Sequence, residues 1–394
     1  PIVVEVRKTY KYRLYRCDKK DRKLRHKLFI ASTIWNHFIA LQRRTYRLNG
    51  KYISLHDMNK HVLKLRKTER FALWKGLHSQ ACQEVCKRVD DAYQRFFNKL
   101  AGRPKFKKVK KYRSFTFPQS GYKVEGNTVT IDGTKYKFVK HRDMAGQIKT
   151  LTVKRDTIGR LWLVFSVVEK MTIGGVSTGK SGGFDFGLKT FLTDDEGRAY
   201  SSPQFFAQGL SKIRLLNRQF SRKVEGSHHH KRARRSLAKH STDVANKRRG
   251  HHFKLANRLC DEYDVLYFED LNLRGMKAMW GRKVSDLGFS SFMSILEWVA
   301  LKRGKTIIKI DRFAPTTKTC SGCRKSHHLT LRDRVLNCDC GLTIDRDHNA
   351  ALNIKTIGAS MVKPSDTKPK VRLRRRVEAE APAFRRGEYV TELL

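Results

Sequence analysis

The stretch Gly183-Phe-Asp-Phe-Gly-Leu188 places a single carboxylate, Asp185, inside an apolar strand. Its neighbour Gly187 lets a metal ion or a phosphate approach the backbone closely, because glycine has no side chain. A second apolar strand, Val265-Leu-Tyr-Phe268, is followed at once by Glu269. Helical periodicity between and after these strands predicts an α/β domain in this part of the chain.

A third acidic position, Asp347, stands just ahead of a helical stretch that begins at His348, two residues after Asp345. Each acid has an ordinary explanation: a buried ion-pair partner for Asp185, a strand-end cap for Glu269, and an N-cap for Asp345 or Asp347. Together they fit a hard cation, because carboxylates are the ligands that Mg²⁺ or Mn²⁺ prefers and strand ends are where such sites open. The three acids therefore predict a metal site of the kind that hydrolyses phosphodiesters with two ions.

Four of the eight cysteines form two close pairs separated by fourteen residues. Two such pairs brought together across a short hairpin are typical of tetrahedral zinc, and four thiolates leave no open position for water, so one structural Zn²⁺ is predicted. Disulfides or core cysteines are the alternative, and His327 or His328 could replace one thiolate. The predicted ligands are Cys320, Cys323, Cys338 and Cys340, with Gly322 and Gly341 allowing tight turns.

The charge of the chain predicts a polyanionic partner. Lys and Arg number 85 against 36 Asp and Glu, which leaves a formal charge of +49 spread along the whole sequence. We identify no apolar run near the roughly 18 residues of a membrane span and no secretory signal pattern, so no membrane association is expected. The expected location is the cytoplasm, with the protein on the nucleoid when it engages DNA.

The N-terminal half predicts a small β-barrel with an inserted helical module. Short strands separated by turn signals run from Phe115 to Lys170, and a strand at 3–15 precedes helical periodicity over 20–100. A basic segment at 101–115 lies between them, and its cations and aromatic residues suit phosphates and unpaired bases. The alternative is a basic loop that leads into a strand. The predicted nucleic-acid contacts are Arg103, Lys105, Lys107, Lys108, Lys110, Lys111 and Arg113.

Four motifs in this order resemble the TnpB family of transposon-encoded RNA-guided nucleases, relatives of type V CRISPR effectors. They are Gly183-Phe-Asp-Phe-Gly-Leu-Lys, Tyr267-Phe-Glu-Asp-Leu-Asn, the four-cysteine ribbon, and Asp345-Arg-Asp-His-Asn-Ala-Ala-Leu-Asn-Ile. The resemblance covers about residues 1–360. It implies an RNase H-like (RuvC) nuclease domain interrupted by the ribbon, in a multidomain α+β chain. Asp185, Glu269 and Asp347 would be catalytic, and Asp345 would cap or orient a helix.

The resemblance also implies partners and an activity. A guide RNA would pair with the target, the protein would recognise a short motif beside it, and double-stranded DNA would be cut in a reaction that needs Mg²⁺ or Mn²⁺. The implied parts are a wedge-like barrel at 1–16 and 101–179, a helical recognition module at 17–100, the nuclease at 180–311 and 345–360, the ribbon at 312–344, and a flexible basic tail at 361–394.

Two alternatives differ in chemistry. A transposase that joins strands would also use three carboxylates, but typically in the order Asp, Asp, Glu, whereas this chain has Asp, Glu, Asp. A guide-dependent repressor without cleavage should have lost at least one acid, and all three are present. Both alternatives are therefore disfavoured against a DNA endonuclease.

Overall fold

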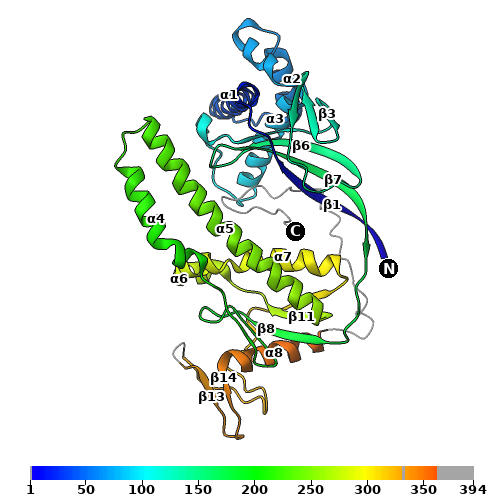
Figure 1. Cartoon of the computed structure of the whole chain (residues 1–394), viewed down its shortest axis with the longest axis vertical. Coiled ribbons are helices and arrows are strands. Elements are labelled where there is room, and N and C mark those ends of the chain that lie inside the picture. Colours follow the sequence, from blue (N-terminus) through cyan, green and yellow to red (C-terminus); the bar gives the residue numbers. More distant parts are fainter. Residues whose placement is uncertain (1, 331–332, 362–394) are drawn as a thin grey trace. The chain divides into compact units, whose positions relative to one another are not determined.

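The protein was analysed as a computed structural model that describes residues 2–330 and 333–361. The described chain divides into two compact units. Residues 5–170 form one, which we call the N-terminal unit, and residues from 171 onward, together with 2–4, form the other, which we call the C-terminal unit. Figure 1 labels the helices and strands of both units. Apart from Met361, the predicted basic tail at 361–394 lies outside the described residues.

The strands of the N-terminal unit form two sheets. One sheet has the order β1-β7-β6-β2, and the other is the meander β3-β4-β5. The meander strands pair with their sequence neighbours because Gly126 and Asp132-Gly133 adopt the positive φ angles that tight hairpin turns require. The strands are β1 (Ile2–Arg13), β2 (Ser114–Phe117), β3 (Tyr122–Glu125), β4 (Thr128–Ile131), β5 (Thr134–Lys137), β6 (Gln147–Arg155) and β7 (Leu161–Ile173).

A helical module is inserted between β1 and β2, which belong to the same sheet, as the sequence predicts. The predicted periodicity is confirmed by burial, because Trp35 and Phe38 of one helix and Cys82 and Val89 of another lie in one core. The elements of this module are α1 (Asp18–Asn49), α2 (Leu55–Leu65), α3 (Ser79–Phe97) and the 3₁₀ helix η1 (Glu69–Gly76), and a second 3₁₀ helix, η2 (Val109–Lys111), precedes β2.

The predicted barrel is not closed in the part of the chain that the structure describes, which corrects that expectation. The two sheets meet where Leu14, just after β1, bridges to Phe138, just after β5. At β2, an edge strand of the four-stranded sheet, Arg88 of α3 donates to the carbonyl oxygen of Ser114 at 2.8 Å. The Arg88 side chain therefore bonds a backbone carbonyl at the sheet edge, a group to which a further strand would otherwise hydrogen-bond.

The C-terminal unit contains a five-stranded sheet with the order β10-β9-β8-β11-β12. Three strands, β8, β11 and β12, are parallel, whereas β9 and β10 pair antiparallel. Alternation of strands with helices is the pattern predicted for this region. The strands are β8 (Ser181–Asp185), β9 (Leu192–Asp194), β10 (Ala199–Tyr200), β11 (Val265–Glu269) and β12 (Thr306–Ile310).

Helices cover both faces of this sheet (Figure 1). Phe184 and Phe268 point to the face covered by α5 and α7, where they stack at 5.1 Å between ring centroids. Tyr267 points to the opposite face and packs against Ile354 of α8. The remaining helices of the unit are α4 (Phe205–Ser221), α5 (His228–Glu262), α6 (Leu273–Leu287), α7 (Phe289–Lys302) and α8 (Arg346–Ser360), and a ribbon hairpin consists of β13 (Val335–Asn337) and β14 (Thr343–Asp345).

One stretch has the length and composition of a membrane span, contrary to the expectation that the chain contains none. Val284–Lys302 has a mean hydropathy of 1.2. Gly288 interrupts it, because its φ of 65° ends α6 and begins α7. The apolar side chains of α7, among them Phe292 and Leu296, pack in the core against the sheet. The stretch is therefore the core helix α7 preceded by the end of another helix.

Helix α8 approaches the sheet closely because two glycines lie at the contact. A Cβ atom at Gly183 would collide with the carbonyl oxygen of Ala351, and one at Gly358 would collide with the ring of Tyr267. At Gly183 the backbone of β8 therefore packs directly against the backbone of α8, and at Gly358 the backbone of α8 packs directly against the ring of Tyr267. The close approach of α8 to the sheet determines where the first turn of this helix lies relative to the ends of β8 and β11.

Substitution Gly183→Ala should lower the free energy of unfolding by about 1–3 kcal/mol, because the added methyl group must displace the α8 backbone. Gly250→Ala is the matched control, since Gly250 lies in α5 with no atom within 4 Å of the added group. Better helix propensity should leave that variant equal to or more stable than the original chain. Urea denaturation of both variants measures the difference, and equal stabilities would contradict the close packing described for α8.

Candidate functional site

Two of the three predicted acids end neighbouring parallel strands. Asp185 is the last residue of β8 and Glu269 the last of β11, and the two strands pair with Phe184 opposite Phe268. Side chains alternate between the faces of a strand. Since Phe184 and Phe268 share the α5/α7 face, Asp185 and Glu269 both point to the face that α8 covers.

Asp347, the third predicted acid, is the second residue of α8. Asp345 is the N-cap of that helix, and its carboxylate accepts hydrogen bonds from the backbone N–H groups of Asp347 at 2.9 Å and His348 at 3.2 Å. The capping role expected for Asp345 is thus confirmed. A Cβ atom on Gly187 would lie 3.5 Å from Oδ2 of Asp347, an ordinary contact distance, so this carboxylate lies beside the segment that follows β8; the close contact that requires a glycine is with the Thr190 carbonyl oxygen, at 2.5 Å.

Asp185 is the acid on which the charges of the other two act. Burial, followed by the negative charges of Asp347 and Glu269, raises the pKa of Asp185 well above its usual range. Burial also raises the pKa of Glu269, whose Oε2 accepts a long hydrogen bond from Thr316 at 3.5 Å. Arg346 is a nearby cation, 3.5 Å from Asp347, and partly offsets this effect on Asp185. A divalent cation would relieve the remaining repulsion.

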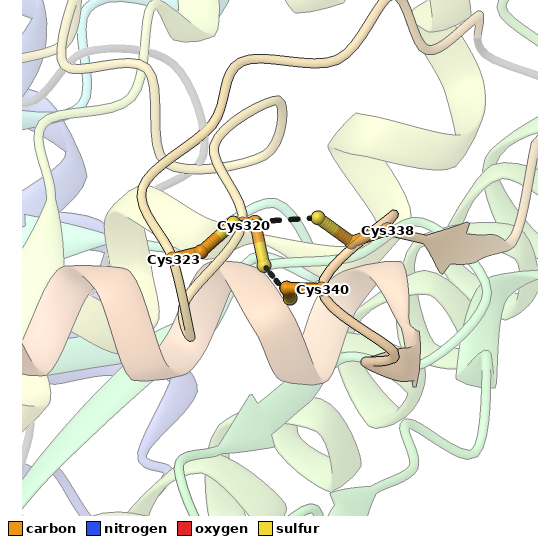
Figure 2. Close-up of side chains that lie close together, drawn as sticks. All are labelled: Cys320, Cys323, Cys338 and Cys340. Atoms are coloured by element: carbon orange, nitrogen blue, oxygen red, sulfur yellow. Dashed lines mark hydrogen bonds between the residues drawn. The ribbon is translucent and has the colours of Figure 1, made fainter.

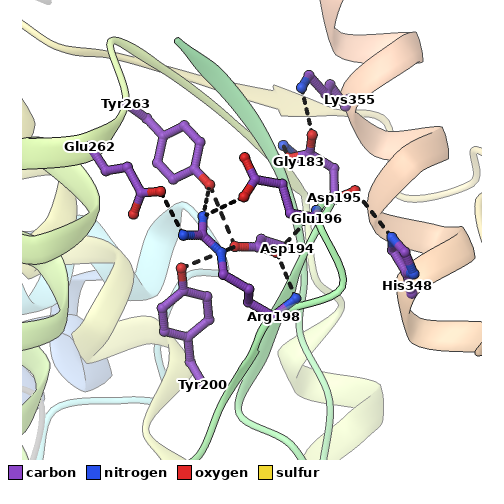
Figure 3. A network of polar contacts seen from close by, with 10 residues as sticks. All are labelled: Gly183, Asp194, Asp195, Glu196, Arg198, Tyr200, Glu262, Tyr263, His348 and Lys355. Carbon is purple, nitrogen blue, oxygen red and sulfur yellow. Dashed lines mark hydrogen bonds and ion pairs between the residues drawn. The ribbon is translucent and has the colours of Figure 1, made fainter. Parts of the chain in front are cut away.

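Two adjacent acids at the end of β9, Asp194 and Asp195, connect the strands and helices around this site (Figure 3). Asp195 accepts a hydrogen bond from the Gly183 N–H at 2.8 Å and pairs with Lys355 of α8 at 2.5 Å. Its carbonyl oxygen lies 3.1 Å from Nε2 of His348, the neighbour of Asp347. Asp195 therefore joins the strand that ends in Asp185 to the helix that begins beside Asp347.

Asp194 points the opposite way and anchors the hairpin that carries Asp195 (Figure 3). Its fully buried carboxylate pairs with Arg198 at 2.7 Å and accepts a hydrogen bond from Tyr200 at 3.0 Å. Arg198 in turn pairs with Glu262 at the end of α5 at 2.7 Å. The sequence predicts only a turn at this position, because adjacent acids before a glycine are typical of exposed turns. The burial of Asp195, in particular, involves Lys355, which is distant in sequence.

The four predicted zinc ligands lie together (Figure 2). All four Sγ atoms are within 4.8 Å of one another, with Cys320 and Cys340 3.8 Å apart and Cys323 and Cys338 3.4 Å apart. Sulfur atoms around a tetrahedral zinc with bonds of about 2.3 Å would be about 3.8 Å apart, so the cluster fits this ion.

The turns beside the four cysteines differ in detail from the prediction. Gly341 has a positive φ of 88°, but in the first pair the residue with a positive φ is Arg324, not Gly322. His327 lies 3.2 Å from the sulfur of Cys338. Four thiolates already complete a tetrahedral site, so this histidine fits a hydrogen bond to a thiolate ligand.

Two buried asparagines of α8 fasten the ribbon beside the acids. Asn353 donates to the carbonyl oxygens of Thr316 at 2.7 Å and Thr319 at 2.6 Å, and Asn349 donates to Thr319 at 2.8 Å. The Ser321 N–H donates to Asn349 at 2.9 Å. The segment that starts the zinc site is therefore bound to the helix that carries Asp347, and Thr316 of this segment also contacts Glu269.

The predicted nucleic-acid segment is a strap along α1 in the N-terminal unit. Its backbone is held by Trp35, which donates to the Lys105 carbonyl at 3.2 Å, and by Asn36, which exchanges two hydrogen bonds with Lys107. The ammonium group of Lys107 lies 3.5 Å from the centroid of the Trp35 ring, and its partial burial lowers its pKa to about 8. All seven predicted cations are exposed residues, namely Arg103, Lys105, Lys107, Lys108, Lys110, Lys111 and Arg113.

The aromatic residues of this segment differ in what they can contact. Tyr112 and Phe115 are buried in the core, which corrects the expectation that they face bases, whereas Phe106 is 52% exposed. The alternative of a basic loop entering a strand is therefore right for the end of the segment. Of these three aromatic residues, only Phe106 exposes its ring to solvent.

Family models match two parts of the C-terminal half. Residues 168–279 match the family described as "Probable transposase", and residues 289–354 match the TNB domain of Cas12f1-like proteins. The first model spans β8 and β11 with their acids Asp185 and Glu269. The second spans the cysteine cluster and Asp347.

Curated relatives share most of the chain length at low identity. A protein of Streptomyces pristinaespiralis described as "Putative RNA-guided DNA endonuclease" is 27% identical over 362 residues, which cover 90% of both chains. InsQ of Escherichia coli, with the same description, is 23% identical over 90% of this chain and 92% of that protein. A TnpB-like protein of Acanthamoeba polyphaga mimivirus is 28% identical over 53% of this chain and 43% of that protein.

A solved structure shares the fold. The cryo-EM structure of a Cas12f1-sgRNA-target DNA complex contains a chain that matches with a TM-score of 0.58 and 13% identity, over 89% of this chain and 99% of that chain. At this identity the match concerns the fold, so the present chain has a multidomain Cas12f-like fold of mixed helices and strands.

Replacing Cys320 by Ser should release zinc and loosen the start of α8, because the first cysteine pair is bound to Asn349 and Asn353. One Zn²⁺ per chain is expected in the original protein by metal analysis, and less than half of that in the variant at equal protein concentration. Cys17→Ser is the matched control, since Cys17 is exposed and lies outside the cluster. A protein purified without any zinc, or a variant with full zinc content, would contradict the assignment.

Asp195→Ala should lower the free energy of unfolding by about 1–3 kcal/mol, because the buried Gly183 N–H and the Lys355 ammonium group both lose their acceptor. Asp195→Asn should cost less, since an amide oxygen can still accept from Gly183. Its exposed neighbour provides the control: Glu196→Ala removes only a surface ion pair to Arg198 and should change stability by less than about 1 kcal/mol. Equal losses for Asp195→Ala and Glu196→Ala in urea denaturation would exclude the bracing role of Asp195.

Proposed function

Because this chain belongs to the TnpB family, we propose that it is an RNA-guided DNA endonuclease whose metal-binding acids are Asp185, Glu269 and Asp347. The observation that supports this proposal most strongly is the convergence of the three acids. Two end adjacent parallel strands on one face of the sheet, and the third begins the helix that covers that face. Three carboxylates from distant segments of the chain in this arrangement suit a shared cation.

The donor set suits Mg²⁺ or Mn²⁺, because carboxylates are the ligands these ions prefer and the raised pKa values of Asp185 and Glu269 show that their charges lack compensation. Two such ions, when bound, would supply an activated water and stabilise the leaving oxygen of a phosphodiester. In this proposal Asp185, Glu269 and Asp347 hold the ions. Thr316 fixes the orientation of Glu269, and Asp345 fixes the first turn of α8 and hence the direction of Asp347.

The positive charge of the chain and its family both support nucleic acids as its partners. The formal charge of +49 favours binding to phosphates, and the matched Cas12f1 structure contains an sgRNA and a target DNA. We infer that this chain binds a guide RNA and a double-stranded DNA target with a short flanking motif. The guide would read the sequence by pairing, while the protein reads the motif and the backbone. The exposed cations at Arg103 to Arg113 are the proposed phosphate contacts.

Strand transfer is the second candidate, because one matching family is described as "Probable transposase". The acids occur in the order Asp, Glu, Asp, which favours hydrolysis over joining. A repressor without cleavage would not require three acids to converge. The products distinguish these candidates: hydrolysis leaves shortened strands, transfer leaves joined strands, and a repressor leaves the DNA intact.

The test uses the full chain purified with its co-expressed RNA, a matching duplex DNA and Mg²⁺. Asp185→Ala, Glu269→Gln and Asp347→Ala should each reduce the cleavage rate by about 10³-fold or more, because each removes a metal ligand. Target binding should stay within about threefold of the original, since the basic surfaces are unchanged. Gel electrophoresis of the products and a filter-binding assay measure the two quantities.

Glu297→Gln is the control for this series, because Glu297 is a half-exposed acid of α7 that pairs with Lys309 away from the three acids. It should cut DNA at the original rate. The proposal fails if the original chain does not cut a target that it binds. It also fails if Asp185→Ala cuts as fast as Glu297→Gln.

A further inference from the structure

A cavity of about 540 Å³ lies beside the C-terminal half of α1 in the N-terminal unit. Its size is in the range of pockets that hold small organic ligands. The lining combines cations with flat rings: Arg43, Arg44, Arg47 and Arg103 together with Tyr46 and Phe106. We call this cavity the arginine cleft.

The periodicity of α1 builds the cleft. Ala40, Arg43, Arg44 and Arg47 are spaced by three and four residues, so they share one face of the helix. Ala40 has a short side chain and leaves the space that the longer arginines surround. The strap supplies the opposite wall, because Arg43 donates to the Pro104 carbonyl at 3.0 Å and thereby holds the backbone beside Phe106.

The charge of the cleft is not neutralised within the described part of the chain, where none of its four arginines forms an ion pair with a carboxylate. In addition, Nε of Arg43 is buried and lacks a hydrogen-bond partner among the described residues. This atom has almost no accessible surface, so the case for an anion rests on the uncompensated charge of the four guanidinium groups. The cleft therefore favours an anionic ligand with several acceptor oxygens, as in a phosphate group.

Two aromatic side chains of the cleft expose rings that could contact a base, which a phosphate group alone would not require. Tyr46 is 63% exposed and Phe106 is 52% exposed, so each presents a large ring to solvent. The guanidinium group of Arg43 lies 4.7 Å from the centroid of the Phe106 ring and supports it from one side. Rings of this kind stack on unpaired bases.

The geometry points to a binding site for an unpaired nucleotide of a nucleic-acid strand, with its phosphate on the arginines and its base on Tyr46 or Phe106. A paired base is already stacked within its duplex, so the ligand is an end, a bulge or a single-stranded segment. The inference rests on the proposed nucleic-acid function for the identity of its partner. It is independent of the three acids, because binding needs no cleavage.

The test measures binding of two fluorescent strands to the full chain without divalent metal. One strand has about ten thymidines, and the other has the same phosphates and sugars without bases. The original protein should bind the thymidine strand about tenfold more tightly, because stacking adds to the phosphate contacts. Tyr46→Ala combined with Phe106→Ala should abolish that difference, whereas Tyr46→Phe should keep it. Both residues are exposed, and circular dichroism checks that the variants are folded.

Two controls separate the cleft from the general charge of the chain. Tyr15→Ala removes another exposed ring, 57% exposed and outside the cleft, and should keep the tenfold preference. Arg44→Ala should reduce the slope of the logarithm of affinity against the logarithm of salt concentration by about one, since one phosphate contact is lost. Arg22→Ala removes an exposed arginine of the same helix outside the cleft and should leave that slope unchanged.

The results of these binding experiments test the arginine cleft separately from the proposed cleavage activity. A strand of uridines, tested beside the thymidines, assigns the cleft to RNA if it binds more tightly and to DNA if it binds less tightly. Equal binding of the strands with and without bases, or an unchanged preference in the double variant, overturns the cleft and leaves guided cleavage untouched. Base-dependent binding by a chain that does not cut DNA supports the cleft and refutes the proposed nuclease.

Discussion

The close contact of α8 with strands β8 and β11 is the constraint on which the candidate site depends. Gly183 and Gly358 remove the side chains that would separate the helix from the sheet. The first turn of α8 then lies where the two parallel strands end. Asp185 and Glu269 lie at these strand ends and Asp347 in that first turn, and burial together with the charges of Asp347 and Glu269 raises the pKa of Asp185. Packing of the unit stabilises this arrangement, and a shared cation would remove its electrostatic cost.

The ribbon is part of the same construction. Asn349 and Asn353 of α8 hold the segment before the first cysteine pair, and Thr316 of that segment contacts Glu269. On the opposite side, Asp195 ties β8 to α8 through Gly183 and Lys355. The helix that begins beside the third acid is thus held from two sides, once by the cysteine cluster and once by a buried carboxylate. Zinc in the ribbon would act on the acids through hydrogen bonds, without touching them.

The predictions that succeeded are those with a local physical cause. A carboxylate that ends an apolar strand, paired cysteines at knuckle spacing and an aspartate that caps a helix each depend on a few neighbouring residues. The failures concern long-range partners. The strand β2 remains an edge of its sheet, and Arg88, from a helix inserted in the sequence, donates to its Ser114 carbonyl. Tyr112 resembles Phe106 in the sequence, yet it is buried, because the strap turns into the core between them.

The sequence alone predicted the four cysteines that lie together, the three acids at strand ends and at the start of a helix, and the resemblance to the TnpB family. These features are short motifs whose chemistry requires particular residue types at particular spacings. Only the tertiary structure decided which face of the sheet the acids share, and it alone revealed the brace at Asp195 and the arginine cleft of α1. Each of these depends on contacts between residues far apart in the chain. Such contacts follow from the packing of whole elements, which local periodicity does not specify.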